Sequence, residues 1–469
     1  MTAEVQIRQE RASSPALEQE RGMNWFEHPV FIERVAFLDQ SQYWSGERHA
    51  DYQLFALRHL TAQAMNVPFY RRMMDKEHLG PESIRSLVDL RRFPIIDKKT
   101  VQGNMALFLA EGADRNLLLN RTTGGSTGTP LTIWFDGDFH PRNKAITEHY
   151  MRVFGLDIFS WRSVRLYGDR IAPEILAEGR YWYVVENRKL VMSCYHIRRE
   201  SAAAYVAELN MFRPRYIHTR PSSILPLAKY VLEDGLRVNP IRTIVCDGEY
   251  LTDGQRRIIE QAFQARLFNV FGHTEACAAG HPCPHSDALH FIPEVGILEL
   301  LDERGNEVTE PGGRGELVVT GFDNPIMPLI RYRTGDIGYL GEQECRCGRH
   351  YKILASIEGR IQDYVIDSAG NPTPLAPAVF NYNDMDWSGI REFKVIQERA
   401  GELTIQIAPE AAWAADADSA KAILASRIGG ILAGFRIVVE IVDDIPRSAI
   451  GKHRYLDQRL DVKDKVSFR

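Results

Sequence analysis

The sequence predicts an α/β protein with a large, mixed α/β N-terminal domain and a small, mobile α+β C-terminal domain. A chain of 469 residues is too long for one ordinary hydrophobic core. Between residues 130 and 345, short β-rich runs alternate with helical stretches, which is typical of a parallel sheet covered by helices. After residue 363 the pattern changes to a hairpin, a helix and a strand. We therefore expect a flexible tail (1–22), a large domain (23–362) and a small domain (363–469).

The individual elements follow from the spacing of apolar residues. Residues 1–22 are polar and aperiodic, which predicts a frayed tail. In residues 52–74, apolar side chains recur at helical spacing from Leu54 to Ala64, and Asn66-Val67-Pro68 then stops the helix. The large domain is predicted to contain strands at 163–167, 216–219, 243–246 and 267–271, helices at 202–211 and 224–233, and antiparallel strands at 296–301 and 315–321. The small domain is predicted to contain a hairpin of 393–397 and 403–407, a helix near 420–432 and a strand at 437–442.

Composition and charge favour a small-molecule partner. The 57 Lys and Arg residues against 62 Asp and Glu residues give a net charge of −5, which provides no basic field for nucleic acid or an acidic membrane surface. No run reaches about 18 uncharged apolar residues, so the sequence predicts no membrane span. Glu4 and Arg8 interrupt the stretch where a secretion signal needs apolar residues. We expect a cytoplasmic protein that binds neither nucleic acid nor membrane, and the sequence leaves a homodimer open.

The six cysteines suggest a metal site rather than disulfides in this compartment. Cys345-Arg346-Cys347-Gly348 is a tight two-thiol turn, and Cys283-Pro284-His285 precedes it in the chain. Three thiolates and one imidazole complete a tetrahedral structural zinc site. We predict Zn²⁺ on Cys283, His285, Cys345 and Cys347, with His290 or Cys277 as substitute ligands. The alternative is a set of reduced thiols on loops.

The segment Arg121-Thr122-Thr123-Gly124-Gly125-Ser126-Thr127-Gly128-Thr129-Pro130 has the composition of a phosphate-binding loop. Its glycines let backbone N–H groups approach an anion, and its hydroxyls can donate to phosphate oxygens. It is not of the Walker type, because no Lys-Ser/Thr pair closes it. Alone, it is also compatible with an ordinary Gly/Thr-rich turn.

The loop resembles the signature of the acyl-adenylate-forming superfamily, although Leu131 stands where that signature usually has a closing lysine. Five further motifs of the superfamily follow in the expected order: Asp247-Gly248-Glu249, Phe271-Gly272-His273-Thr274-Glu275, Arg331-Tyr332-Arg333-Thr334-Gly335-Asp336, Gly359-Arg360 and Pro446-Arg447-Ser448-Ala449-Ile450-Gly451-Lys452. Within the superfamily, the pattern from Tyr52 through Val67-Pro68-Phe69-Tyr70-Arg71 to Pro94-Ile95-Ile96-Asp97-Lys98 resembles the phenylacetate-CoA ligase family. Arg220-Pro221-Ser222-Ser223 and Phe393-Lys394-Val395-Ile396-Gln397-Glu398 are similar to its capsule-biosynthesis-like branch.

This resemblance implies an ATP-dependent ligase with Mg²⁺ as cofactor. The enzyme would convert a small carboxylic acid, aryl or related, to its acyl-AMP with release of pyrophosphate. CoA is the acceptor that the family implies, but the Arg-Gly-x-Asn run that phenylacetate ligases carry near the CoA tunnel is missing after Gln362. An amine or a carrier protein therefore stays open as acceptor. A non-catalytic protein that binds nucleotide and zinc is the other alternative.

The resemblance also implies a role for each motif. The β and γ phosphates are assigned to Thr122, Thr123, Gly124, Gly125, Ser126, Thr127 and Gly128. Thr274 and Glu275 are assigned to the α-phosphate and Mg²⁺, and Asp336 to the ribose hydroxyls, which suit the two acceptor oxygens of a carboxylate. The adenine is assigned to Gly248, Glu249, Phe271 and Gly272, which have sheet packing as their alternative role.

The remaining assignments concern the second domain and the acid. Lys452 is expected to be catalytic, because a mobile ammonium can bridge the carboxylate and the α-phosphate. Arg360 is expected to contact the ribose, and Gln362 occupies the hinge position, where the family usually has an acidic residue or lysine. The acid pocket is expected to include Tyr167, His218, Ser222 and His273. The sequence does not specify which acid binds there.

Overall fold

The computed structural model describes residues 25–122, 131–157, 161–169, 171–360, 364–375, 390–409, 434–446 and 455–460. Its helices are α2 (Pro29–Ser41), α3 (Gly46–Ala64), α4 (Pro68–Lys76), α5 (Lys98–Gly103), α6 (Phe139–Val153), α7 (Pro173–Ala177), α8 (Arg199–Phe212), α9 (Pro221–Glu233) and α10 (Asp253–Phe263). Its central feature is a 12-stranded sheet of order β11-β12-β13-β14-β10-β9-β8-β7-β6-β3-β5-β4.

The strands of this sheet are β3 (Ser163–Tyr167), β4 (Trp182–Val185), β5 (Lys189–Ser193), β6 (Tyr216–Thr219), β7 (Thr243–Asp247), β8 (Arg266–Gly272), β9 (Ala279–Cys283), β10 (Ser286–Phe291), β11 (Gly296–Leu301), β12 (Arg314–Gly321), β13 (Tyr332–Leu340) and β14 (Lys352–Arg360). A separate hairpin pairs β1 (Leu119–Thr122) with β2 (Thr132–Phe135). Short 3₁₀ turns occupy Trp25–Glu27, Pro81–Ser83, Leu87–Arg92, Met105–Leu107, Arg115–Leu117 and Cys194–His196.

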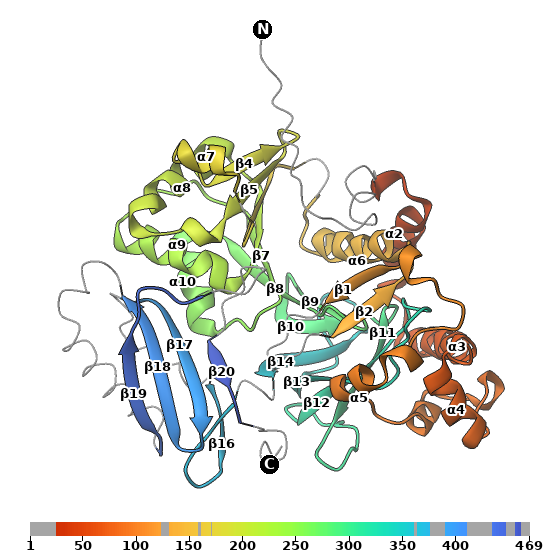
Figure 1. Cartoon of the computed structure of the whole chain (residues 1–469). Coiled ribbons are helices and arrows are strands. Elements are labelled where there is room, and N and C mark those ends of the chain that lie inside the picture. The colour runs from red at the N-terminus through yellow and green to blue at the C-terminus, as the bar shows by residue number, and fades with distance from the viewer. Residues whose placement is uncertain are drawn as a thin grey trace.

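One half of the sheet is parallel. Strands β5, β3, β6, β7 and β8 run in the same direction, and β4 is an antiparallel edge. Helices α8, α9 and α10 lie together on one face (Figure 1), where they bury Leu166, Ile217 and Ile244. Residues at the end of α6 cover Val245 and Phe268 on the opposite face. The predicted strands and helices of this region are confirmed, because a strand buried on both faces consists of the apolar, β-branched residues that the sequence shows.

The other half, from β9 to β14, is antiparallel, which confirms the prediction for 296–301 and 315–321. Arg331 precedes β13 and donates to both carboxylate oxygens of Glu299 on β11, at 2.9 and 2.8 Å. Both side chains are 8% exposed. A bidentate pair satisfies both charges at this depth, so Arg331 has a structural role in positioning the start of β13.

The N-terminal helices pack on the antiparallel half through Leu57, Leu60 and Ala64. The predicted stop is confirmed: α3 ends at Ala64, and Pro68 begins α4. Proline favours the first turn of a helix, because its missing N–H would have no partner inside the helix there. The segment 52–74 therefore contributes to two helices.

In the C-terminal region, a four-stranded sheet of order β19-β18-β17-β20 is described, besides the pair β15 (Tyr364–Ile366) and β16 (Pro372–Pro374). The predicted hairpin is β17 (Ile390–Arg399) and β18 (Glu402–Pro409), and the predicted last strand is β19 (Arg436–Ile441). Strand β20 (Leu456–Gln458) pairs parallel with β17. The predicted tail, the helix near 420–432 and the hinge residue Gln362 lie outside the described residues.

Candidate active site and metal centre

The predicted acid and adenine residues gather at the carboxyl edge of the parallel strands. Tyr167 is the last residue of β3, and Gly272 is the last residue of β8. His218 is the second-last residue of β6. Gly248, Glu249, Phe271 and His273 lie on or directly after strand ends, and Ser222 lies in the first turn of α9, which follows β6. In open α/β sheets, ligands bind outside this edge. The arrangement therefore fits a ligand site.

Asp247, the last residue of β7, joins two of the predicted pocket residues. Its Oδ2 accepts a hydrogen bond from the Tyr167 hydroxyl at 2.9 Å and lies 3.0 Å from His218 Nε2. Burial raises the pKa of Asp247, but the His218 and Tyr167 contacts and the Arg220 charge outweigh it and leave the pKa lowered. The Asp247-Gly248-Glu249 motif is recognisable in the sequence, but it does not indicate a role for the Asp247 side chain, whose only sequence signal is its place at the end of a buried strand.

Glu249 supports the helix that follows β6. The backbone N–H and the hydroxyl of Ser222 donate to the Glu249 carboxylate at 3.0 and 2.9 Å, at the first turn of α9. A carboxylate at a helix N-terminus is favourable, because it accepts from N–H groups that have no partner within the helix. Gly248 has φ of +69°, which favours glycine. The motif thus builds a rigid turn at the edge of the sheet.

The loop His273-Thr274-Glu275 connects two of the predicted motifs. Tyr332 on β13 donates its hydroxyl to Glu275 Oε1 at 2.9 Å, and His273 Nδ1 lies 3.1 Å from Glu275 Oε2. Glu275 is only 9% exposed. The proposed metal-binding carboxylate and the strand that carries Asp336 are therefore held together, although they are far apart in the sequence.

Asp336 is buried on β13, and its backbone N–H donates to Thr334 Oγ1 at 3.0 Å. The backbone of Arg360 lies directly opposite Asp336 in the β13–β14 register. The two residues assigned to the ribose are therefore neighbours across two strands. The side chain of Arg360 lies outside the described part of the structure.

The ends of the predicted phosphate loop are brought together by the β1–β2 hairpin. Thr122 pairs with Thr132, and their hydroxyl oxygens are 3.2 Å apart. Leu131 is completely buried, so this position packs into the core. The remaining predicted loop residues, Thr123, Gly124, Gly125, Ser126, Thr127 and Gly128, lie outside the described residues, as does Lys452.

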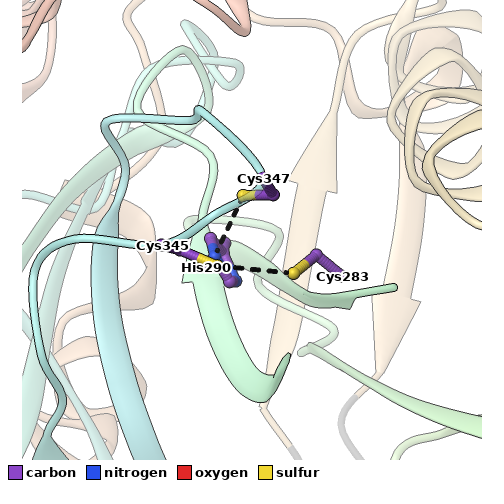
Figure 2. A group of neighbouring side chains, drawn as sticks. All are labelled: Cys283, His290, Cys345 and Cys347. Carbon is purple, nitrogen blue, oxygen red and sulfur yellow. Dashed lines mark hydrogen bonds between the residues drawn. The ribbon is translucent and has the colours of Figure 1, made fainter. Parts of the chain in front are cut away.

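Figure 2 shows a second group of side chains, formed by Cys283, His290, Cys345 and Cys347. Their donor atoms all lie within 4.8 Å of one another. The sulfurs of Cys283 and Cys345 are 3.6 Å apart, and Cys347 Sγ is 3.5 Å from His290 Nε2. Tetrahedral Zn²⁺ with bonds of about 2.3 Å to sulfur and about 2.0 Å to nitrogen gives donor separations of about 3.5–3.8 Å. These two separations match those of a tetrahedral zinc site, and the donor set of three sulfurs and one nitrogen suits zinc.

Of the two predicted histidines, the structure groups the substitute His290, and not His285, with the three cysteines. Cys283 pairs directly with Ser286 in the β9–β10 hairpin, so His285 lies in the connecting turn and is exposed. His290 lies farther along β10 and is fully buried. Cys277 is not in the group; its thiol donates to the Glu275 carbonyl at 3.3 Å.

Neighbouring groups orient the candidate metal ligands. His290 Nδ1 is 3.0 Å from the Ala288 carbonyl oxygen, which assigns the N–H to Nδ1 and leaves the lone pair of Nε2 for a metal. The Gly348 N–H donates to the Cys345 carbonyl at 3.1 Å and closes the two-thiol turn. Burial raises the pKa of the Cys283 thiol to about 12, so a metal would have to displace its proton.

Comparisons with known proteins agree with the adenylation motifs. No family model matches the chain. A phenylacetate-coenzyme A ligase of Thermus thermophilus is 26% identical over 358 residues, which cover 72% of this chain and 75% of that protein. A phenylacetate-coenzyme A ligase of Pseudomonas putida is 24% identical over 362 residues, 72% of this chain and 76% of that protein. Protein CapK of Staphylococcus aureus is 26% identical over 274 residues, 58% of each chain.

This similarity to phenylacetate-coenzyme A ligases supports the resemblance to the phenylacetate-CoA ligase family of the acyl-adenylate-forming superfamily. A solved structure of 2-hydroxyisobutyryl-CoA ligase in the postadenylation state shares the fold, with a TM-score of 0.68 and 20% identity over 91% of this chain and 92% of that one. The signature of the superfamily usually ends in a lysine, and this chain has the buried Leu131 at that position. An aliphatic side chain cannot supply the positive charge of that lysine to a phosphate. In the described part of the chain, no helix is both long and apolar enough to cross a bilayer.

Proposed function

We propose that this protein activates a small carboxylic acid with ATP, forms the acyl-AMP and pyrophosphate, and then transfers the acyl group to CoA. The observation that carries the proposal is the Tyr332–Glu275 hydrogen bond, which joins the Thr274-Glu275 loop to the Asp336 strand beside the carboxyl edge of the parallel sheet. The proposal also draws on the names of the relatives, which are phenylacetate-CoA ligases. We assign to this chain the type of reaction that these relatives are named for, but not their acid.

The chemistry explains why these groups must meet. The carboxylate oxygen of the acid attacks the α-phosphorus, and the bond from that phosphorus to the leaving pyrophosphate breaks. Positioning and charge stabilisation dominate such a step. Glu275 would hold Mg²⁺, which supplies positive charge to the phosphates when bound. Thr274 would contact the α-phosphate, Asp336 would hold the ribose, and Lys452 would reach the reacting oxygens from the second domain.

CoA is not the only candidate acceptor of the acyl group. An adenylating ligase can also pass the acyl group to an amine or a carrier protein. A D-alanine–D-alanyl carrier protein ligase of Streptococcus equi is 28% identical over 221 residues, but these cover only 38% of this chain. We favour CoA because the relatives named as CoA ligases match much longer stretches of the chain.

The test is acid-dependent release of pyrophosphate from ATP, measured over aromatic, aliphatic and amino acids with and without CoA. We expect one group of acids to release pyrophosphate, and CoA to be consumed with the same acids as the thioester forms. A panel in which no acid releases pyrophosphate would contradict adenylation. Release without any thioester would leave adenylation standing and shift the acceptor to an amine or a carrier protein.

The Tyr332–Glu275 contact gives a more specific prediction. Tyr332→Phe removes one hydrogen bond to a buried carboxylate, which costs about 1.5–3 kcal/mol when the acceptor is charged. With Glu275 less firmly oriented, we expect slower pyrophosphate release and a higher Mg²⁺ concentration for half-maximal rate, measured by magnesium titration. Tyr339→Phe is the matched control, because Tyr339 is on the same strand but contacts Glu358 at 3.4 Å. An equal magnesium requirement in both variants would remove the proposed positioning role of Tyr332.

The second part of the proposal concerns zinc. We infer that Cys283, His290, Cys345 and Cys347 hold one Zn²⁺ with a structural role. All four ligands come from the protein, which is the pattern of structural rather than catalytic sites. The ion would fasten the two-thiol turn after β13 to the β9–β10 hairpin. Next to this turn, Arg349 is buried and donates to Gln42 Oε1, at the end of α2, at 3.1 and 2.5 Å. Zinc would therefore also stabilise the attachment of α2.

A further inference from the structure

Three polar side chains occupy the carboxyl ends of neighbouring strands in the parallel half of the sheet. They are Tyr167 on β3, His218 on β6 and Asp247 on β7. Successive side chains of a strand point to opposite faces, so Asp247 shares a face with Val245. Val245 packs against Met151 and Phe154 from the end of α6. The Asp247 carboxylate therefore lies at the edge of the sheet, on the face that α6 covers.

The side chains of Asp247 and His218 are accessible to solvent, and the Tyr167 ring is held in place by its neighbours. The side chain of His218 is 25% exposed and that of Asp247 is 32% exposed. The Tyr167 ring has the Arg165 guanidinium 4.3 Å from its centre and the Arg220 guanidinium 4.9 Å from its centre. These cation–π contacts fix the ring, and with it the hydroxyl that donates to Asp247. A ligand would therefore meet a carboxylate whose orientation is already set.

The hydrogen bonds leave half of the Asp247 carboxylate for a ligand. Tyr167 and His218 both contact Oδ2, and among the described residues no group donates a hydrogen bond to Oδ1. An ionised carboxylate is purely an acceptor, with about four lone-pair sites on its two oxygens. Oδ1 therefore suits a hydrogen-bond donor on a bound molecule. An apolar group placed against it would exclude water from a charge without replacing the lost hydrogen bonds.

We propose that Asp247 determines specificity, and that the acid activated by this enzyme carries a hydroxyl or amino group that donates a hydrogen bond to Asp247 Oδ1. This inference rests on the proposed adenylation and names the class of acid for it. Tyr167 and His218 act as positioning residues that hold the carboxylate. Sites built to bind a substrate hydroxyl or amine discriminate strongly against analogues without one, because the site is then left with an unpaired polar group.

Two alternative roles of Asp247 must be distinguished from the proposed one by experiment. It could serve only as an anchor for Tyr167 and His218 in the folded protein. It could also accept from the amino group of adenine, because Gly248 and Glu249 follow it directly and are assigned to the nucleotide. The first role predicts no dependence on the acid. The second role predicts a change in the KM for ATP rather than for the acid.

The experiment compares acids in matched sets by pyrophosphate release: phenylacetate with its hydroxyl- and amino-substituted forms, benzoate with its hydroxyl- and amino-substituted forms, and butyrate with hydroxybutyrates and aminobutyrates. In wild type, we expect kcat/KM for the best donor-bearing acid to exceed that of its unsubstituted parent by about tenfold or more. The hydroxyl and amino arms identify which donor is used. This ranking tests the proposal even if a variant fails to fold.

Asp247→Asn keeps the shape but replaces one carboxylate oxygen by an amide group. We expect it to reduce the preference for donor-bearing acids to within about threefold, through the KM for the acid, with the KM for ATP unchanged. Asp234→Asn is the control, because Asp234 pairs with Arg199 beyond the other end of α9. Equal use of the unsubstituted parents by wild type, an unchanged ranking in Asp247→Asn, or an effect on ATP alone overturns the inference. Failure of every acid would instead overturn the proposed adenylation, and this inference with it.

Discussion

Replacing Lys452 by alanine is expected to lower the rate of acyl-AMP formation by about 10²-fold or more. Losing one group that stabilises charge in the transition state of an acyl transfer commonly costs this much. The ground-state complex should be affected far less, because the phosphate loop, Asp336 and Glu275 are predicted to lie in the large domain, and Lys452 in the small one. We therefore expect ATP affinity to stay within a few-fold of wild type. The two quantities can be measured by single-turnover pyrophosphate release and by calorimetric titration with ATP.

A control lysine in the same predicted domain makes this prediction specific. Lys394 on β17 forms an ion pair with Asp457 on β20 at 3.2 Å, so Lys394→Ala removes a lysine that supports the small sheet. We expect Lys394→Ala to change thermal stability more than the rate of adenylation. Unchanged pyrophosphate release in Lys452→Ala, or equal losses in both variants, would refute a direct role of Lys452 in the chemistry.

Local sequence patterns predicted the elements of the parallel half correctly, and the reason is physical. A strand such as β7, Thr243-Ile244-Val245-Cys246-Asp247, is buried on both faces and must consist almost entirely of apolar residues, so its identity can be read without neighbours. The same holds for the stop before Pro68, because proline cannot continue the preceding turn. Both features depend only on the residues of one short segment, so the sequence alone is enough to predict them.

Contacts between distant segments could not be read in this way. The motifs that contain Glu275 and Tyr332 were both recognised, but the hydrogen bond between them joins residues 57 positions apart. It depends on how β8, β9 and β13 meet in three dimensions. The Asp247 carboxylate was missed for the same reason, since its partners Tyr167 and His218 come from two other strands. Only the order of strands in the sheet brings these three residues together.

The proposed zinc site illustrates that nearness in the sequence does not determine which residues group in the structure. The short spacing between Cys283 and His285 favours His285 as a ligand, but the hairpin register places His285 in the turn. With Cys283 paired to Ser286, His285 lies in the turn and is exposed, whereas His290 pairs opposite His281 inside the sheet. Register follows from the turn and from burial, and neither is visible in a spacing of cysteines and histidines.

The corrected ligand set predicts the metal content of three variants. Wild type is expected to contain about one zinc per chain by elemental analysis, and His290→Ala and the double variant Cys345→Ser, Cys347→Ser should fall to background, because a structural site needs all its ligands. His285→Ala is the matched control and should keep its zinc, since that side chain is exposed in the turn.

Removal of metal from wild type by a chelator should lower its thermal midpoint, because a bound structural metal contributes directly to folding. The same chelator should leave His290→Ala unchanged. Background zinc in wild type would refute the site, and loss of zinc from His285→Ala with retention in His290→Ala would restore His285 as the ligand.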